Sequence, residues 1–168
     1  LKSGLIAIVL SLSAMLIYIW IRFEWQFSLG AIIALIHDVI ITIGFFSILE
    51  FEINLSIVAA VLTIVGYSMN DTVVIFDRVR ENLKKYSSKS INEISNLSIN
   101  ETLSRTIITS STTLLALLSI FFFGGKILQG FSFAMILGVI FGTYSSIFIA
   151  NPILIKLKVD QKSVLKGE

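Results

Sequence analysis

The sequence predicts an all-α membrane protein, a single transmembrane domain built as a bundle of five helices. Hydrophobic residues make up 55% of the 168 residues, charged residues make up only 14%, and the mean hydropathy is +0.92. A soluble domain carries about 25% charged residues, so the lipid bilayer is the expected solvent of this chain. The apolar residues also form long runs. In lipid the backbone must satisfy its own hydrogen bonds, and runs of this length do so as helices.

Five apolar runs are long enough to cross the hydrocarbon core, which needs roughly 17–25 residues of helix. The predicted spans cover residues 4–23, 27–49, 53–76, 99–123 and 128–155. The first run, Leu5 to Ile21, is longer than the apolar region of a secretory signal, and no small-residue cleavage site follows it. We therefore interpret it as a span. Pro152, the one proline of the chain, lies near the end of the fifth run.

The distribution of lysine and arginine predicts that the N-terminus lies outside and the C-terminus in the cytoplasm. One side of the membrane receives ten of these residues, namely Arg22, five in the segment 77–98 and four in the tail 156–168. The other side receives only Lys2 and Lys126. Cytoplasmic loops carry the excess of basic residues in membrane proteins, so the ten basic residues are assigned to the cytoplasm.

The segment 77–98 is the one sizeable polar stretch and is predicted to lie in the cytoplasm. Its first part, 77–85, is expected to continue the third helix into water, with Glu81 and Lys85 spaced for a helical ion pair. Two later patterns fit capping boxes, Ser90-x-x-Glu93 and Ser98-x-x-Glu101. The first predicts a short surface helix over 91–96, and the second predicts the start of the fourth span.

Ionisable residues within the predicted spans are the candidate functional residues, because a charge in the bilayer is costly and usually faces protein or water. They are Asp38 beside His37, Asp71 beside Asn70, and Arg105. With a helical rise of about 1.5 Å per residue, Asp71 and Arg105 lie at a similar depth, roughly 9–10 Å from the cytoplasmic side. Because their helices are antiparallel neighbours, the sequence predicts that these two can pair. Asp38 is deeper and could be a second proton-binding station.

Simpler interpretations of these residues remain open. Arg105 could pair with Glu101 on its own helix or extend its guanidinium to the cytoplasmic interface. Asp71 could be held by the hydroxyls of Ser68 and Tyr67, and His37 could be a neutral packing residue. Asp38 has fewer simple interpretations, because a carboxylate at mid-membrane must be neutral, paired or hydrated.

Two stripes of small or hydroxylated residues extend along the last two spans. Thr109 and Thr113 follow Arg105 at helical spacing and would suit a hydrated proton path. They could equally bond other helices or their own backbone. In the fifth span a small residue recurs at every fourth position, which predicts close helix packing. These residues are Gly130, Ala134, Gly138, Gly142, Ser146 and Ala150.

Four segments resemble a known family when taken in order. They are 18–23 (YIWIRF), 34–39 (ALIHDV), 65–82 (VGYSMNDTVVIFDRVREN) and 100–106 (NETLSRT). The resemblance is to the SecF branch of the SecD/SecF protein-export membrane proteins, within the resistance–nodulation–division superfamily. It covers essentially the whole chain and implies a multi-pass protein of the bacterial inner membrane.

The resemblance also implies function. Members of this family pair SecD with SecF, assist the SecYEG translocon, and use the proton motive force to aid preprotein export. Their proton-coupling acid and arginine correspond to Asp71 and Arg105 here. A complete SecF-like protein has a first helix and a periplasmic domain before this region, and these are expected to be missing from this sequence. The preprotein would meet that region.

Other functions are also considered. A structural subunit that stabilises SecD and the translocon without moving protons is the main alternative, and a drug or lipid exporter half of the same superfamily is a third. The sequence has no nucleotide-binding loop of the Walker kind and no cysteine. We therefore expect no enzyme activity, no cofactor and no metal site. The absence of a basic block with interleaved aromatic residues makes nucleic acid an unexpected partner.

Overall fold

The computed structural model describes residues 2–50, 55–86 and 88–159, and within them every regular element is helical. The helices, in chain order, are α1 (Lys2–Arg22), α2 (Trp25–Ile48), α3 (Leu55–Lys85), α4 (Ile91–Phe123), α5 (Lys126–Ser145), the π-helix η1 (Ser146–Ala150) and α6 (Asn151–Lys156). The predicted all-α class is confirmed. Part of the predicted tail, residues 160–168, lies outside the described residues.

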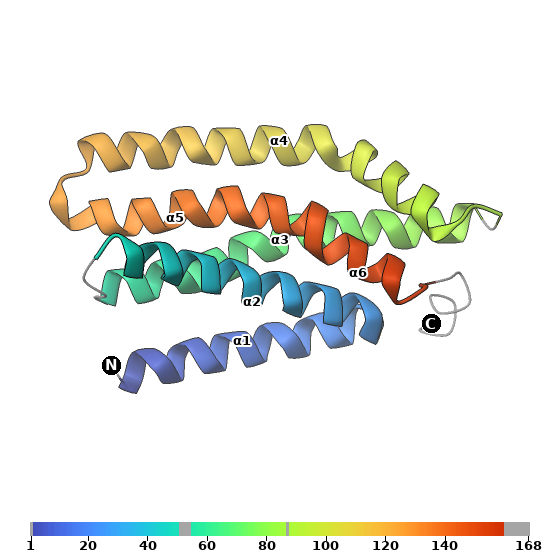
Figure 1. Cartoon of the computed structure of the whole chain (residues 1–168), viewed down its shortest axis with the longest axis horizontal. Coiled ribbons are helices and arrows are strands. Elements are labelled where there is room, and N and C mark those ends of the chain that lie inside the picture. The colour runs from blue at the N-terminus through green and yellow to red at the C-terminus, as the bar shows by residue number, and fades with distance from the viewer. Residues whose placement is uncertain (1, 51–54, 87, 160–168) are drawn as a thin grey trace.

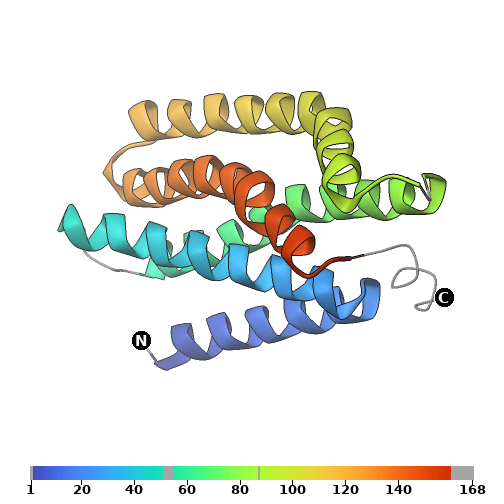
Figure 2. The same cartoon turned by 45° about the vertical axis from the view of Figure 1, so that its right-hand side comes forward.

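The helices form a layered bundle with α3 and α5 at its centre (Figures 1 and 2). The two central helices pack most extensively on each other, α2 covers one side of them, and α4 covers the other. Helix α1 is peripheral and contacts α2 and α3. The α1–α2 turn, the α3–α4 connection and the end of α6 gather at one end of the bundle, which we call the α3–α4 end (Figure 1).

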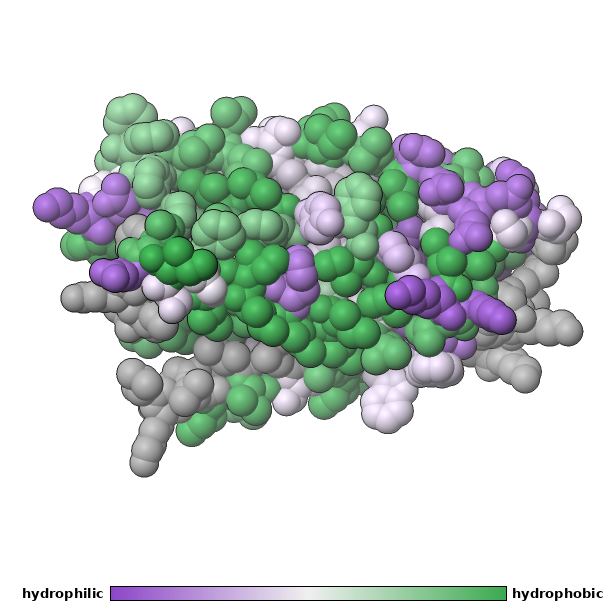
Figure 3. All heavy atoms as spheres, in the orientation of Figure 1, coloured by the Kyte–Doolittle hydropathy of each residue, from purple (hydrophilic) through white to green (hydrophobic). Residues whose placement is uncertain are grey.

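Four helical stretches within the described residues are long and apolar enough to cross a membrane: Trp25–Ile48, Leu55–Lys85, Ile91–Phe123 and Lys126–Lys156. The apolar part of α1, Val9–Arg22, is shorter. Figure 3 shows apolar side chains over the middle of the visible face and hydrophilic ones gathered mainly at its two ends. The chain is therefore a multi-pass helical protein, and the fifth span remains a prediction.

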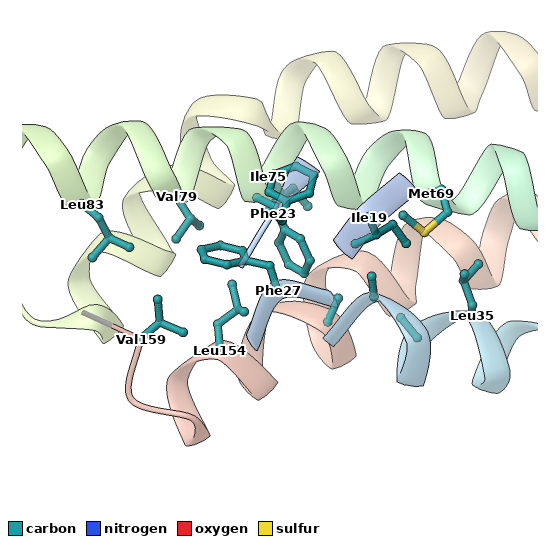
Figure 4. Close-up of a cluster of buried hydrophobic side chains, with 14 of the residues drawn as sticks. Ile19, Phe23, Phe27, Leu35, Met69, Ile75, Val79, Leu83, Leu154 and Val159 are labelled. Carbon is teal, nitrogen blue, oxygen red and sulfur yellow. The ribbon is translucent and has the colours of Figure 1, made fainter. Parts of the chain in front are cut away.

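The α3–α4 end is held together by an aromatic cluster and by ion pairs. Phe23, Phe27 and Phe76 pack with ring centroids 5.2–6.1 Å apart, and Figure 4 shows Phe23 and Phe27 among Leu154, Val79 and Ile75. The neighbouring charged groups tie the α1–α2 turn to α3 through two ion pairs, Arg22–Asp77 at 3.0 Å and Arg80–Glu24 at 3.1 Å.

The N-terminal part of α4 differs from the prediction. The capping box at Ser90 and Glu93 is confirmed, but the helix that it begins continues without a break to Phe123. The prediction of a second start at Ser98 is therefore wrong. Ser98 is buried in the middle of the helix and donates its hydroxyl to the Ile94 carbonyl oxygen at 2.8 Å. A serine hydroxyl that is already bonded to the preceding turn cannot cap a new helix. Such back-bonding also bends helices, and α4 bends in its N-terminal half (Figures 1 and 2).

The small residues of the last span differ in how closely a neighbouring helix packs against them. Ala134 and Ala150 are fully buried. A Cβ atom added at Gly138 would overlap the Ile64 side chain, and one added at Gly142 would lie 3.0 Å from the Ser68 Cβ atom. Gly130, by contrast, has open space at its Cβ position. Close approach of α5 to α3 thus begins after Gly130 and continues to the π-helix.

Candidate functional site

Asp38 on α2 is enclosed by hydroxyl donors from two other helices. Its side chain is fully buried. The hydroxyls of Ser68 on α3 and Ser145 on α5 donate to its Oδ2 atom at 2.6 and 2.7 Å. The Nδ1 atom of His37 lies 3.0 Å from its Oδ1 atom. A buried carboxylate needs such partners to offset its lost hydration, so Asp38 joins three helices.

Asp71 on α3 is also buried, but it has fewer hydrogen bonds. It accepts one from the Thr143 hydroxyl of α5 at 3.4 Å, which is long for an O–H donor. Thr143 in turn lies 2.7 Å from the Ser110 hydroxyl of α4. Asp71, Thr143 and Ser110 therefore form a polar chain that crosses the bundle from α3 through α5 to α4.

The two acids are linked through one stretch of α5 and η1, residues 143–146. This stretch supplies a hydroxyl to Asp71 from Thr143 and one to Asp38 from Ser145, while Ser146 lies 2.8 Å from the Thr72 hydroxyl of α3. The π-helix begins at Ser146, and π-helical turns occur frequently at functional sites. We call these residues the hydroxyl segment.

Sequence reasoning misses the hydroxyl segment, although a signal for it is present. Thr143, Ser145 and Ser146 fall within four consecutive positions of a largely apolar span, together with the hydroxyl-bearing Tyr144. Only Ser146 is among the predicted residues, as a small packing residue. The sequence left open that the hydroxyls of Ser68 and Tyr67 hold Asp71, and this alternative is wrong. Ser68 donates to Asp38 instead. The buried Tyr67 hydroxyl has no hydrogen-bond partner in the described part of the chain.

Arg105 lines a groove between α3 and α4. The groove has a volume of about 450 Å³, and we call it the α3–α4 groove. Its lining residues are Val74, Asp77, Arg78, Glu81, Glu101, Thr102 and Arg105. The Arg105 guanidinium makes no hydrogen bond or ion pair within the described part of the chain, but it is near enough to Asp71 to interact electrostatically. Direct pairing of these two residues is therefore not present in this conformation.

Glu101 does not form an ion pair with Arg105 either. Its Oε2 atom accepts from Arg78 at 2.7 Å and from Asn82 at 2.8 Å, both on α3. The open alternative in which Glu101 pairs with Arg105 is therefore wrong for this conformation. Glu81, expected to pair with Lys85, bonds Arg78 at 2.6 Å instead.

The remaining candidates lie around this network. The hydroxyls of Thr109 and Thr113 donate to carbonyl oxygens of their own helix, as one of the two interpretations allowed. Asn70 is exposed on α3. The His37 ring is partly buried and lies 6.4 Å from the Tyr144 ring between centroids. No group of three His, Cys, Asp or Glu side chains that could hold a metal ion occurs among the described residues.

The fold and this site define a class. The chain is a multi-pass helical membrane protein with two enclosed carboxylates at its centre and an arginine beside a polar groove. Buried acids and an arginine within spanning helices are typical of ion and proton pathways rather than of simple anchors.

Comparison with known proteins identifies the family. The family described as "Protein export membrane protein SecD/SecF, C-terminal" matches residues 1–160, so the chain belongs to this family. The protein translocase subunit SecF of Rickettsia bellii is 60% identical over 153 residues, which are 91% of this chain and 50% of that protein. The SecF subunit of Rhodothermus marinus is 57% identical over 165 residues, which are 94% of this chain and 54% of that protein.

Solved structures agree. The crystal structure of SecDF from Thermus thermophilus, titled a translocon-associated membrane protein, matches with a TM-score of 0.89 at 43% identity over 92% of this chain and 22% of that chain. A super-membrane-facing form of SecDF matches with a TM-score of 0.83 at 45% identity over 88% of this chain and 20% of that chain. The chain spans about half of the length of the curated relatives that it matches.

Proposed function

We propose that the chain is the membrane part of a protein-export subunit that converts the proton motive force into helix movement. Asp71 takes up and releases the proton, and Arg105 responds to its charge. In this proposal the chain pairs with SecD in the bacterial inner membrane. The pair assists SecYEG, and preprotein contacts regions outside this chain. Lipid surrounds the bundle.

The observation that carries this proposal is the sparse hydrogen bonding of Asp71 beside an unpaired Arg105. An ionised Asp71 attracts the guanidinium, because an opposite charge nearby favours the ionised acid. A protonated Asp71 is neutral and releases it. Binding a proton from one side of the membrane and losing it to the other would thus alternate the attraction between α3 and α4.

The driving force is sufficient for such a step. Moving one elementary charge across 100 mV is worth about 2.3 kcal/mol, which is more than a typical hydrogen bond between membrane helices contributes. One proton per cycle could therefore break a contact such as that between Ser110 and Thr143, which lie 2.7 Å apart. The polar α3–α4 groove is the route by which water would reach Arg105 from the aqueous side.

We assign Asp38 a second proton-accepting role, deeper in the bundle and connected to Asp71 through the hydroxyl segment. Asn70, His37, Thr109 and Thr113 are assigned supporting polar roles. Thr109 and Thr113 could donate to water when their back-bonds open.

The topology belongs to the same proposal. Helix α1 is the first of five spans, with the N-terminus outside and the α3–α4 end in the cytoplasm. The basic residues support this orientation, since the α3–α4 end carries Lys84, Lys85 and Lys89 and cytoplasmic loops carry such an excess.

The test is proton flux into vesicles that contain the complete export complex. Asp71→Asn should abolish flux while the complex stays assembled, because an amide neither takes up nor releases a proton in this range. Glu50→Gln is the matched control, since it neutralises an exposed carboxylate at the end of α2 and should leave flux unchanged. Undiminished flux in Asp71→Asn would refute the proposal.

A structural assembly subunit is the second candidate. It is favoured by the tight fit of Gly138 and Gly142 against α3. Under that function Arg105→Gln would lower the amount of assembled complex and leave the flux per complex unchanged. Under the first function the same variant would lower the flux per complex.

A further inference from the structure

Glu101 occupies the position from which an acid normally forms an ion pair with Arg105 within one helix. It lies four residues before Arg105 on α4, and an acid four residues before a base is the favourable order for a helical ion pair. Both side chains also line the α3–α4 groove. An isolated α4 would therefore pair these two residues and keep the guanidinium away from α3.

Two residues of α3 prevent this. Arg78 donates from its Nε atom to Glu101 Oε2 at 2.7 Å, and Asn82 donates to the same oxygen at 2.8 Å. Asn82 is 1% exposed and also donates to the Ser98 hydroxyl at 2.9 Å, so its amide is fixed in position. We call Arg78, Asn82 and Glu101 the clamp.

We propose that Arg78 and Asn82 are positioning residues that keep Arg105 free for Asp71 by occupying Glu101. The inference rests on the proposed function and deepens it. With the clamp closed, the Oε2 atom of Glu101 is held by Arg78 and Asn82, although Arg78 also pairs with Glu81. Arg105 then remains available to Asp71. With the clamp open, Glu101 captures the guanidinium and Asp71 loses its electrostatic partner.

Each helix packed around Asp71 and Arg105 contributes its own charged or polar groups. Helix α3 contributes Asp77, Arg78 and Glu81 to the groove, and Asp77 also pairs with Arg22. Helix α4 contributes Glu101 and Arg105. Helix α5 offers Asp71 only the neutral Thr143 hydroxyl among the described contacts, and the His37–Asp38 pair of α2 has its own donors on Ser68 and Ser145. None of these neighbours from α5 or α2 replaces Arg105 as a cationic partner of Asp71.

The experiment is the pH profile of proton flux in vesicles that contain the complete complex. Arg78→Gln should shift the midpoint for protonation of the coupling acid upward by about half a pH unit or more. The direction follows because a carboxylate without its cation binds a proton at higher pH. Lys89→Gln removes the same unit charge from the α3–α4 connection, outside the groove, and should leave the midpoint unchanged.

The double variant Arg78→Gln/Glu101→Gln separates positioning from structure. It removes both charged members of the clamp. A neutral amide at position 101 cannot hold the guanidinium by charge, so the midpoint should return toward that of the unaltered protein. If the clamp only stabilised the fold, the midpoint of the double variant would be shifted at least as far as that of Arg78→Gln. That result, or an unshifted midpoint in Arg78→Gln, would overturn the inference. Loss of flux in Asp71→Asn is unaffected by either outcome, so the proposed function is tested separately.

Discussion

The two buried acids of this bundle have opposite surroundings. Asp38 has three polar partners at 2.6–3.0 Å, two of them from other helices. Asp71 has one hydrogen bond at 3.4 Å and a guanidinium nearby that is not directly bonded to it. An acid enclosed by short hydrogen bonds holds helices together, whereas one with a single long bond can change its protonation state without dismantling the packing. Under the proposed function, we therefore expect Asp38 to contribute mainly to assembly and Asp71 mainly to proton exchange.

The largest effect should come from neutralising the two acids separately. Asp71→Asn should remove proton flux and leave the stability of the purified complex nearly unchanged, since little hydrogen bonding is lost. Flux and thermal unfolding of the same preparation provide the check. A strong loss of stability in this variant would show that the contrast between the two acids is wrong.

Replacing Asp38 should affect stability first. Asp38→Ala leaves the buried Ser68 hydroxyl without its acceptor and leaves Ser145 only its longer bond to the Gly142 carbonyl oxygen at 3.2 Å. An unsatisfied buried donor costs about 1–3 kcal/mol. We expect a lower unfolding temperature and less assembled complex, with reduced flux as a consequence. The triple variant Asp38→Ala/Ser68→Ala/Ser145→Ala should recover part of the stability, because no donor is then left unpaired. No recovery would mean that packing and not hydrogen bonding explains the loss.

An effect on stability, without a direct effect on flux, is expected where α5 meets α3 before the hydroxyl segment. Gly138→Ala places a methyl group against Ile64 and should destabilise the bundle by about 1–3 kcal/mol through overpacking. Gly130→Ala is the matched control, since the space at its Cβ position is open. Equal unfolding temperatures for both variants would contradict the predicted difference between these two glycines.

The smallest effect should come from the link that joins Asp71 to α4. Ser110→Ala removes the hydroxyl that lies 2.7 Å from that of Thr143. Hydrogen bonds between membrane helices contribute about 0.6 kcal/mol on average, so stability should fall only slightly. Flux should fall by a few-fold if Thr143 then turns away from Asp71. Ser119→Ala, on an exposed turn of the same helix, should change neither quantity.

Much of the architecture could be predicted from the sequence. Apolar run length locates the apolar parts of the helices, because a backbone in lipid must bond to itself, but it does not locate the polar first turns of α4 or the π-helical turn at Ser146. Capping chemistry at Ser90 also identifies the beginning of a helix correctly. The same pattern at Ser98 is misleading, since a serine in a helix interior can bond the preceding turn instead, and local spacing does not distinguish these two uses.

Hydropathy and the rise per residue are enough to identify the charged residues inside the predicted spans, because both depend only on the order of residues in the chain. The hydrogen-bond and ion-pair partners of these residues follow from the packing of the helices. Whether Glu101 bonds Arg105 or Arg78, and whether Ser68 serves Asp71 or Asp38, depends on how each helix is rotated about its axis against its neighbours. That rotation is set by the packing of small residues such as Gly138 and Gly142 against α3. A packing contact involves two helices at once, so neither helix's sequence specifies it alone.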